Sequence, residues 1–171
     1  MIHELYKKAG ELHGHYCPGL AIGVRAAAIA LERLNIEEKS KGLYCIAESR
    51  ACYIDGIQSV FGTTAGNGTL EILDRGKAAF NFFDRDKGKA LRLVTLEMPA
   101  GMSREETIEY ILTAPAERIF SETPTHFNAP ENTYTRQNSR RCPICGEECR
   151  EPYMTLLDGV LVCPDCSERR K

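Results

Sequence analysis

Long hydrophobic runs are missing from this chain of 171 residues. Its longest apolar stretch, about residues 20–34, is interrupted by Arg25, Glu32 and Arg33, so it cannot span a bilayer. Charge of one sign is not in excess either, because the formal net charge is −2. That value argues against a cationic chain that binds nucleic acid or membranes as a whole. Residues 1–17 lack the basic-then-apolar order of a secretory signal, so we expect a soluble cytoplasmic protein with no membrane association.

Cysteine, in contrast, is abundant, with eight residues. In a small secreted domain this count would suggest disulfides, but in a reducing compartment clustered cysteines more often bind metal or carry redox chemistry. Four of them form two CxxC pairs near the C-terminus, with Cys149 close by. Cys17, Cys45 and Cys52 lie in the first third of the chain, and Cys45 has the context of a small buried strand residue.

The order of the predicted elements is typical of an α+β domain. Helical spacing of apolar residues, Pro18 at a first turn and a capping box from Ser103 to Glu106 predict helices over residues 2–12, 18–34, 52–62 and 103–112. Strands are predicted over residues 43–48, 77–85 and 90–99, the last two joined as a hairpin by a turn at 86–89.

These elements divide the chain into three parts. Residues 1–120 are predicted to form the α+β core, with a mixed sheet and helices. Residues 121–141 are polar, rich in Pro and Asn and without periodicity, which favours a linker, and they contain three arginines near their end (Arg136, Arg140 and Arg141). Residues 142–171 are predicted to form a small C-terminal module.

Two CxxC pairs define that module: Cys142 with Cys145, and Cys163 with Cys166. The spacing is that of a tetrahedral zinc site with four thiolates, as in a zinc ribbon or treble clef. Between the pairs we expect a hairpin with Asp158-Gly159 at its tip. Residues 142–171 are too few to fold on a hydrophobic core, so zinc would supply the folding energy. Two disulfides, or unrelated surface cysteines, are the alternatives.

A second set of soft ligands lies in "HGHYCPGLAIGVR", residues 13–25. If the segment is extended, His13, His15 and Cys17 point to one side. Cys17 and Cys52 each stand at or just before the first turn of a predicted helix, where unpaired N–H groups favour a thiolate and therefore metal ligation or nucleophilic catalysis. A solvated loop with a buried structural cysteine is the alternative. Asp55 is expected on the same side of its helix as Cys52, either as a partner of a ligand histidine or as a solvated carboxylate.

Three segments together resemble a known family. "HGHYCPGLAIGVR", "CYIDGIQSVFGTTAGNGTL" and "RGKAAFNFF" are similar to the FmdE (or FwdE) family of formylmethanofuran dehydrogenase proteins over about residues 1–120. The terminal cysteine module is similar to a zinc finger that some members carry. The resemblance implies a core fold of the FwdE/GAPDH-like type, a homodimer, and a site in which His13, His15, Cys17 and Cys52 converge.

Three functional hypotheses follow. The first is a metal-binding protein with a transition metal in the core, zinc by default, and a structural zinc in the tail, accessory to molybdenum or tungsten formylmethanofuran dehydrogenase-type metabolism. The chain lacks the cysteine patterns of molybdopterin or ferredoxin proteins, so it cannot catalyse formylmethanofuran oxidation by itself. The second is a metal- or thiol-dependent enzyme with Cys17 or Cys52 as nucleophile. The third is a metal-sensing adaptor whose zinc finger binds nucleic acid or protein.

Overall fold

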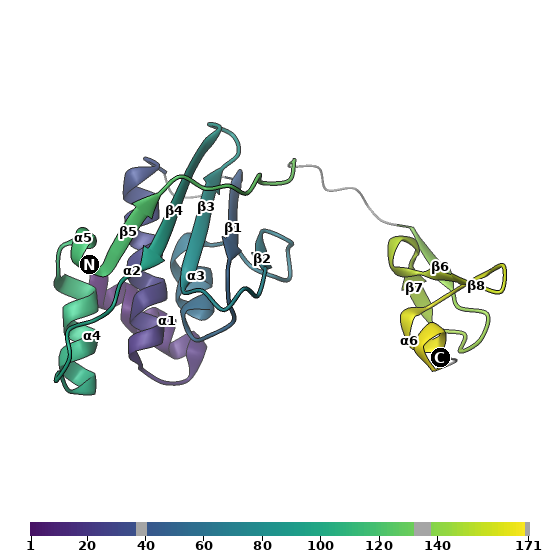
Figure 1. The fold of residues 1–171 in the computed structure, drawn as a ribbon, viewed down its shortest axis with the longest axis horizontal. Helices are drawn as coiled ribbons and strands as arrows, with labels where there is room; N and C mark the ends of the chain where they lie inside the picture. The colour runs from purple at the N-terminus through teal and green to yellow at the C-terminus, as the bar shows by residue number, and fades with distance from the viewer. Residues whose placement is uncertain (37–40, 132–137, 170–171) are drawn as a thin grey trace. The chain divides into compact units, whose positions relative to one another are not determined.

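The structure of the chain, a computed structural model, describes residues 1–36, 41–131 and 138–169 (Figure 1). It consists of two units, Met1–Asn132 and Thr133–Lys171, and each is considered by itself. In the described part of the chain, no helix is both long and apolar enough to cross a membrane.

A five-stranded mixed sheet forms the centre of the first unit, with strand order β2-β1-β3-β4-β5. β1 pairs with β2 in parallel, and the other neighbours are antiparallel. The predicted hairpin is present as β3 and β4, in which Phe80 lies opposite Leu93. The strands are β1 (Leu43–Ala47), β2 (Leu70–Ile72), β3 (Ala79–Asp84), β4 (Lys89–Thr95) and β5 (Phe120–Thr123). The α+β fold class with a mixed sheet is confirmed.

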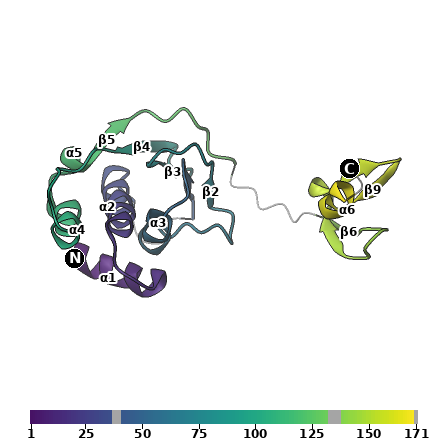
Figure 2. The same ribbon diagram turned by 60° about the horizontal axis from the view of Figure 1, so that its bottom comes forward.

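Helices cover one face of this sheet in two layers. Figure 2 shows α2 and α3 next to the strands and α1 on the far side of those two helices. Phe80, Phe82 and Leu93 of the sheet and Leu20 and Ile57 of the helices are fully buried in the core between them. The helices are α1 (Ile2–His13), α2 (Pro18–Arg33), α3 (Tyr53–Phe61), α4 (Arg104–Thr113) and α5 (Ala116–Ile119).

Local sequence signals explain most of the helix ends. Pro18 occupies the first turn of α2, where its missing N–H has no helical partner to lose. Ser103 and Glu106 form the predicted capping box of α4. Gly62 ends α3 in the left-handed region, at a φ of 78° that a residue with a Cβ adopts only at a cost. Cys45 is fully buried in β1, as predicted.

The domain boundaries differ from the predicted ones at both ends of the segment 121–141. β5 and the residues after it belong to the first unit, where Phe127 packs against Tyr44 and Phe83 on the sheet face opposite the helices. Arg140 and Arg141 lie in β6 (Ser139–Arg141) of the second unit. Residues 132–137 of the predicted linker, including Arg136, lie outside the described residues.

The second unit is built around the cysteine pairs. β6 pairs with β7 (Glu148–Arg150), and β8 (Thr155–Leu157) pairs with β9 (Val160–Val162) around the predicted Asp158-Gly159 turn. A short 3-10 helix, η1 (Glu151–Tyr153), lies between the two hairpins, and α6 (Pro164–Glu168) starts at the second cysteine pair.

Candidate metal centre

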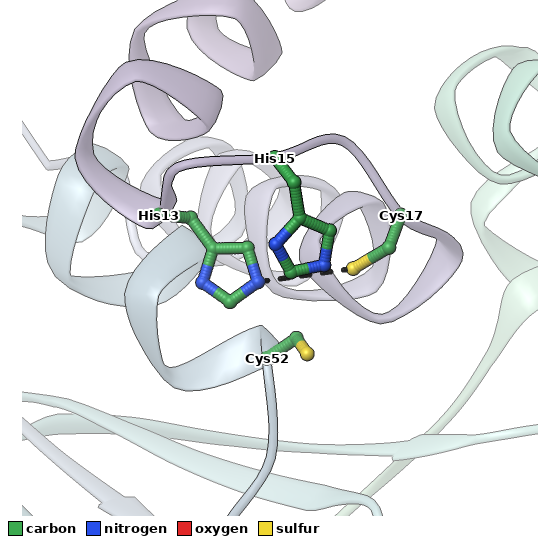
Figure 3. Close-up of side chains that lie close together, drawn as sticks. All are labelled: His13, His15, Cys17 and Cys52. Carbon is green, nitrogen blue, oxygen red and sulfur yellow. Dashed lines mark hydrogen bonds between the residues drawn. The ribbon is translucent and has the colours of Figure 1, made fainter.

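The four residues predicted to bind metal in the core lie together (Figure 3). One ligand atom from each of His13, His15, Cys17 and Cys52 lies within 4.8 Å of the others. They come from the end of α1, the connection to α2, and the starts of α2 and α3. Two imidazoles and two sulfurs at this separation match the donor set that zinc and other late transition metals prefer.

The His13 ring is oriented by Asp55. Its Nδ1 lies 2.6 Å from Oδ2 of Asp55 on α3, so this nitrogen donates a hydrogen bond to the carboxylate. The other ring nitrogen, Nε2, faces Sγ of Cys17 at 4.0 Å. Gln58 donates a hydrogen bond to the second carboxylate oxygen of Asp55, at 3.2 Å. Asp55 therefore has the position predicted for a partner of a ligand histidine, and it leaves Nε2 available for a metal ion.

Cys17 occupies the N-cap position of α2. Its Sγ accepts a hydrogen bond from the backbone N–H of Leu20 at 3.3 Å, as an N-cap side chain does. Tyr6 on α1 donates its hydroxyl to the carbonyl of Cys17 at 3.1 Å. Burial and the nearby Cys17 raise the pKa of Tyr6 to about 12, so this donor keeps its proton. Cys17 is thus held from both helices, its sulfur by α2 and its carbonyl by α1.

Cys52 also occupies an N-cap position, that of α3, but its sulfur makes no capping hydrogen bond. Burial raises the pKa of Cys52, and the adjacent Cys17 raises it further. Two thiolates this close repel each other, and a cation between them offsets that repulsion. A backbone N–H of the helix N-terminus therefore reaches the sulfur of Cys17, whereas the sulfur of Cys52 has no such hydrogen bond.

A close crossing of α2 and α3 brings the two sulfurs together. A Cβ added at Gly23 would lie 2.0 Å from the carbonyl oxygen of Tyr53, and one added at Gly56 would lie 2.7 Å from the carbonyl oxygen of Leu20. At Gly19 an added Cβ would lie 3.2 Å from Cβ of Cys52. Only glycine allows these backbones to approach so closely. The glycines of α2 therefore form a packing surface, and its packing positions the site.

A buried ion pair that was not predicted from the sequence holds Glu48, four residues before Cys52. Glu48, fully buried at the end of β1, accepts two hydrogen bonds from Arg92 of β4, at 2.7 and 3.0 Å. Asn81 of β3 donates a third, at 3.0 Å. Burial alone would raise the pKa of Glu48, but these hydrogen bonds outweigh it and the pKa is lowered. In the sequence, Arg92 within the mostly apolar stretch "ALRLVTL" was the signal that could have revealed this ion pair.

His15 reaches the cluster by a route other than the predicted one. The segment is not extended throughout, because His13 ends α1 and Gly14 follows in the left-handed region, at a φ of 85°. The rings of His13 and His15 lie side by side, with centroids 4.3 Å apart.

The four cysteines of the second unit form the other cluster. Ligand atoms of Cys142, Cys145, Cys163 and Cys166 lie within 4.8 Å of one another. Backbone N–H groups of Cys163 and Cys145 lower the pKa of Cys142 to about 6, whereas burial and the neighbouring sulfurs raise that of Cys166 to about 12. Gly146 makes the predicted tight turn, at a φ of 78°. Cys149 stays outside the cluster, and its Sγ lies 3.6 Å from the carbonyl oxygen of Arg150.

The fold and the first cluster define the class of protein. A model of the family described as "FmdE, Molybdenum formylmethanofuran dehydrogenase operon" matches residues 12–121, which include His13, His15, Cys17 and Cys52. The match spans more than half of the chain, and the chain therefore belongs to the FmdE family.

The chain is also similar to two other known proteins. A probable S-adenosyl-L-methionine-binding protein of Archaeoglobus fulgidus is 39% identical over 95 residues, which are 53% of this chain and 26% of that protein. The chain thus spans about a quarter of that relative's length. A tungsten formylmethanofuran dehydrogenase FmdE-like protein of Syntrophus aciditrophicus has a similar solved structure, with a TM-score of 0.73 and 21% identity over 97% of this chain and 91% of the other. The second likeness shows the fold alone.

Proposed function

We propose that this FmdE-family chain binds a transition-metal ion in its core through His13, His15, Cys17 and Cys52. The observation that carries the proposal is the convergence of their ligand atoms within 4.8 Å, from segments far apart in the sequence. The hydrogen bond from His13 to Asp55 supports it, because metal-binding histidines commonly donate their second ring nitrogen to a carboxylate. Zinc is the default ion for mixed His and Cys ligation.

The second cluster is proposed to hold a structural zinc ion through Cys142, Cys145, Cys163 and Cys166. Four thiolates close the coordination sphere, so this ion supplies folding energy and no chemistry. A role accessory to molybdenum or tungsten formylmethanofuran dehydrogenase-type metabolism is supported by the description of the family and by the name of the structural neighbour. The homodimer, the cytoplasmic location, a protein or nucleic-acid partner of the tail, and a nucleophilic role of Cys17 or Cys52 stay predictions.

The proposal is tested by counting metal ions in the purified full-length chain. Elemental analysis is expected to find about two ions per chain, one for each cluster of four ligands. Cys17→Ser should remove the core ion alone, and Cys142→Ser the tail ion alone. Cys149→Ser is the matched control, because Cys149 lies beside the tail cluster without belonging to it, and it should keep both ions. Equal metal content in Cys17→Ser and the unaltered chain would refute the core site.

A further inference from the structure

One of the four core ligands is held less firmly than the others. The His13 ring is oriented by its hydrogen bond to Asp55. The sulfur of Cys17 accepts a hydrogen bond from the backbone N–H of Leu20, and Cys52 packs against Gly19. The His15 side chain is exposed, and its ring makes no hydrogen bond or ion pair with any residue that the structure describes. Its ring stacks, tilted, on the His13 ring. Figure 3 shows the two rings side by side, with Cys17 and Cys52 beyond them.

The backbone around His15 is anchored even though its ring is not. Gly14 donates its N–H to the carbonyl of Gly10 at 2.8 Å and closes α1. On the other side, Arg104 of α4 donates to the carbonyl of Tyr16 at 2.7 Å, and the Tyr16 ring covers Gly10. Rotation about the side-chain bonds of His15 can therefore move its ring into solvent while the neighbouring backbone stays in place. Exposed side chains change rotamer on a timescale of picoseconds to nanoseconds.

We propose that His15 is the exchangeable ligand of the core metal site and that a small thiol from solution takes its place. This inference rests on the proposed function, because it requires an ion in the core. When the core holds an ion, His15 would be released as a ligand and the sulfur of the thiol would replace it. The proton of the thiol would pass to solvent. No oxidant or reductant is needed.

The chemistry of the site favours a thiol over a harder ligand. A site that already contains two cysteine sulfurs selects soft donors, and a third sulfur suits it better than a carboxylate does. The carboxylate of Asp55 remains paired with His13 throughout.

The experiment uses the full-length chain loaded with Co²⁺ and 2-mercaptoethanol as the probe. The spectrum of the core ion is obtained by subtracting that of Cys17→Ser, which retains the tail cluster. Titration with the probe is expected to increase the sulfur-to-cobalt charge-transfer absorption in a saturable way while the cobalt content stays constant. His15→Ala should retain the core cobalt and bind the probe at least about 10-fold more tightly, because no ligand has to be displaced. His13→Ala should lose the core cobalt.

The controls separate this inference from the proposed function. Far-ultraviolet circular dichroism confirms that each variant is folded, and His15→Gln replaces His15→Ala if the latter does not fold. If the unaltered chain holds no core cobalt, the proposed function itself fails. If it holds cobalt, either of two results with the probe overturns the inference: the spectrum stays unchanged, or the probe strips the ion from the core. A loss of cobalt in the position-15 variant as complete as in His13→Ala also overturns it.

Discussion

At the scale of single residues, the candidate metal centre includes a carboxylate that is not one of the four predicted ligands. Asp55 accepts a hydrogen bond from Nδ1–H of His13, which fixes both the tautomer and the orientation of the ring. A free imidazole would have to lose rotational freedom on binding the ion, whereas this one is already directed at Cys17. Asp55 should therefore contribute to metal affinity without being a ligand.

The corresponding prediction is that Asp55→Ala lowers the affinity of the core for metal by about 10- to 100-fold, the usual effect of losing such a partner. Competition with a chromophoric chelator measures the change. Asp55→Asn is the matched variant: its amide oxygen still accepts the Nδ1 hydrogen bond, and it should recover most of the loss. An Asp55→Ala chain with unaltered affinity would show that the His13 ring needs no second partner.

Residue types and spacing were enough to predict the four residues of the cluster, but not all of the contacts that position them. Asp55 could be predicted because it follows Cys52 by three positions and so shares its side of a helix. Glu48 and Tyr6 could not, because each acts through a partner distant in the sequence, Arg92 and the carbonyl of Cys17. The His13 and His15 rings come together because α1 ends at His13 and Gly14 follows in the left-handed region. The alternation of side chains along an extended segment, on which the prediction relied, does not produce this arrangement.

At the scale of elements, the site is a product of the crossing between α2 and α3. Gly23 of α2 lies against the backbone of Tyr53, the first residue of α3, directly after Cys52. The distance between these two helices decides whether the sulfurs of Cys17 and Cys52 can share an ion. Core packing and metal binding are therefore coupled at this crossing.

Gly23→Ala tests that coupling. The added methyl group would lie 2.0 Å from the carbonyl oxygen of Tyr53, so the helices must separate. We expect a loss of about 1–3 kcal/mol in the free energy of unfolding, as for other overpacked cores, together with a loss of the core ion. Thermal unfolding and elemental analysis measure the two effects, and the tail ion should remain.

Gly66→Ala is the control, because a Cβ at Gly66 would meet open space. It should change neither the unfolding midpoint nor the metal content. If Gly23→Ala is destabilised but keeps a full core ion, the crossing supports the fold without setting the geometry of the site.

Elements with strong local sequence signals were predicted, whereas short strands that form only by pairing with a neighbouring strand were not. The helices with capping or proline signals and the β3–β4 hairpin follow from the sequence, because their periodicity and turn residues agree. β2 and β5 are three and four residues long. Such segments become strands only because β1 and β4 offer unpaired edges, which is a tertiary effect. The predicted core therefore ended at residue 120, just where β5 begins.

At the scale of the whole molecule, the two units differ in the size and composition of their buried cores. The first has an extensive apolar core between the sheet and the helices. In the second, the buried cluster consists of Cys142, Cys163, Cys166 and one aliphatic residue, Val162. A unit whose interior is mostly cysteine sulfur gains little hydrophobic stabilisation, so its folding should depend on the proposed zinc ion.

Metal removal should therefore unfold one unit and leave the other folded. After exhaustive chelation of the full-length chain, amide resonances from residues 138–169 are expected to lose their dispersion. Resonances of β3 and β4 should stay dispersed, because Phe80, Phe82 and Leu93 remain buried without any ion. Cys142→Ser should reproduce the effect on the tail without a chelator, and zinc returned to the unaltered chain should reverse it. A tail that stays folded after verified loss of both ions would instead mean that its cysteines are linked by disulfides, the alternative left open by the two CxxC pairs.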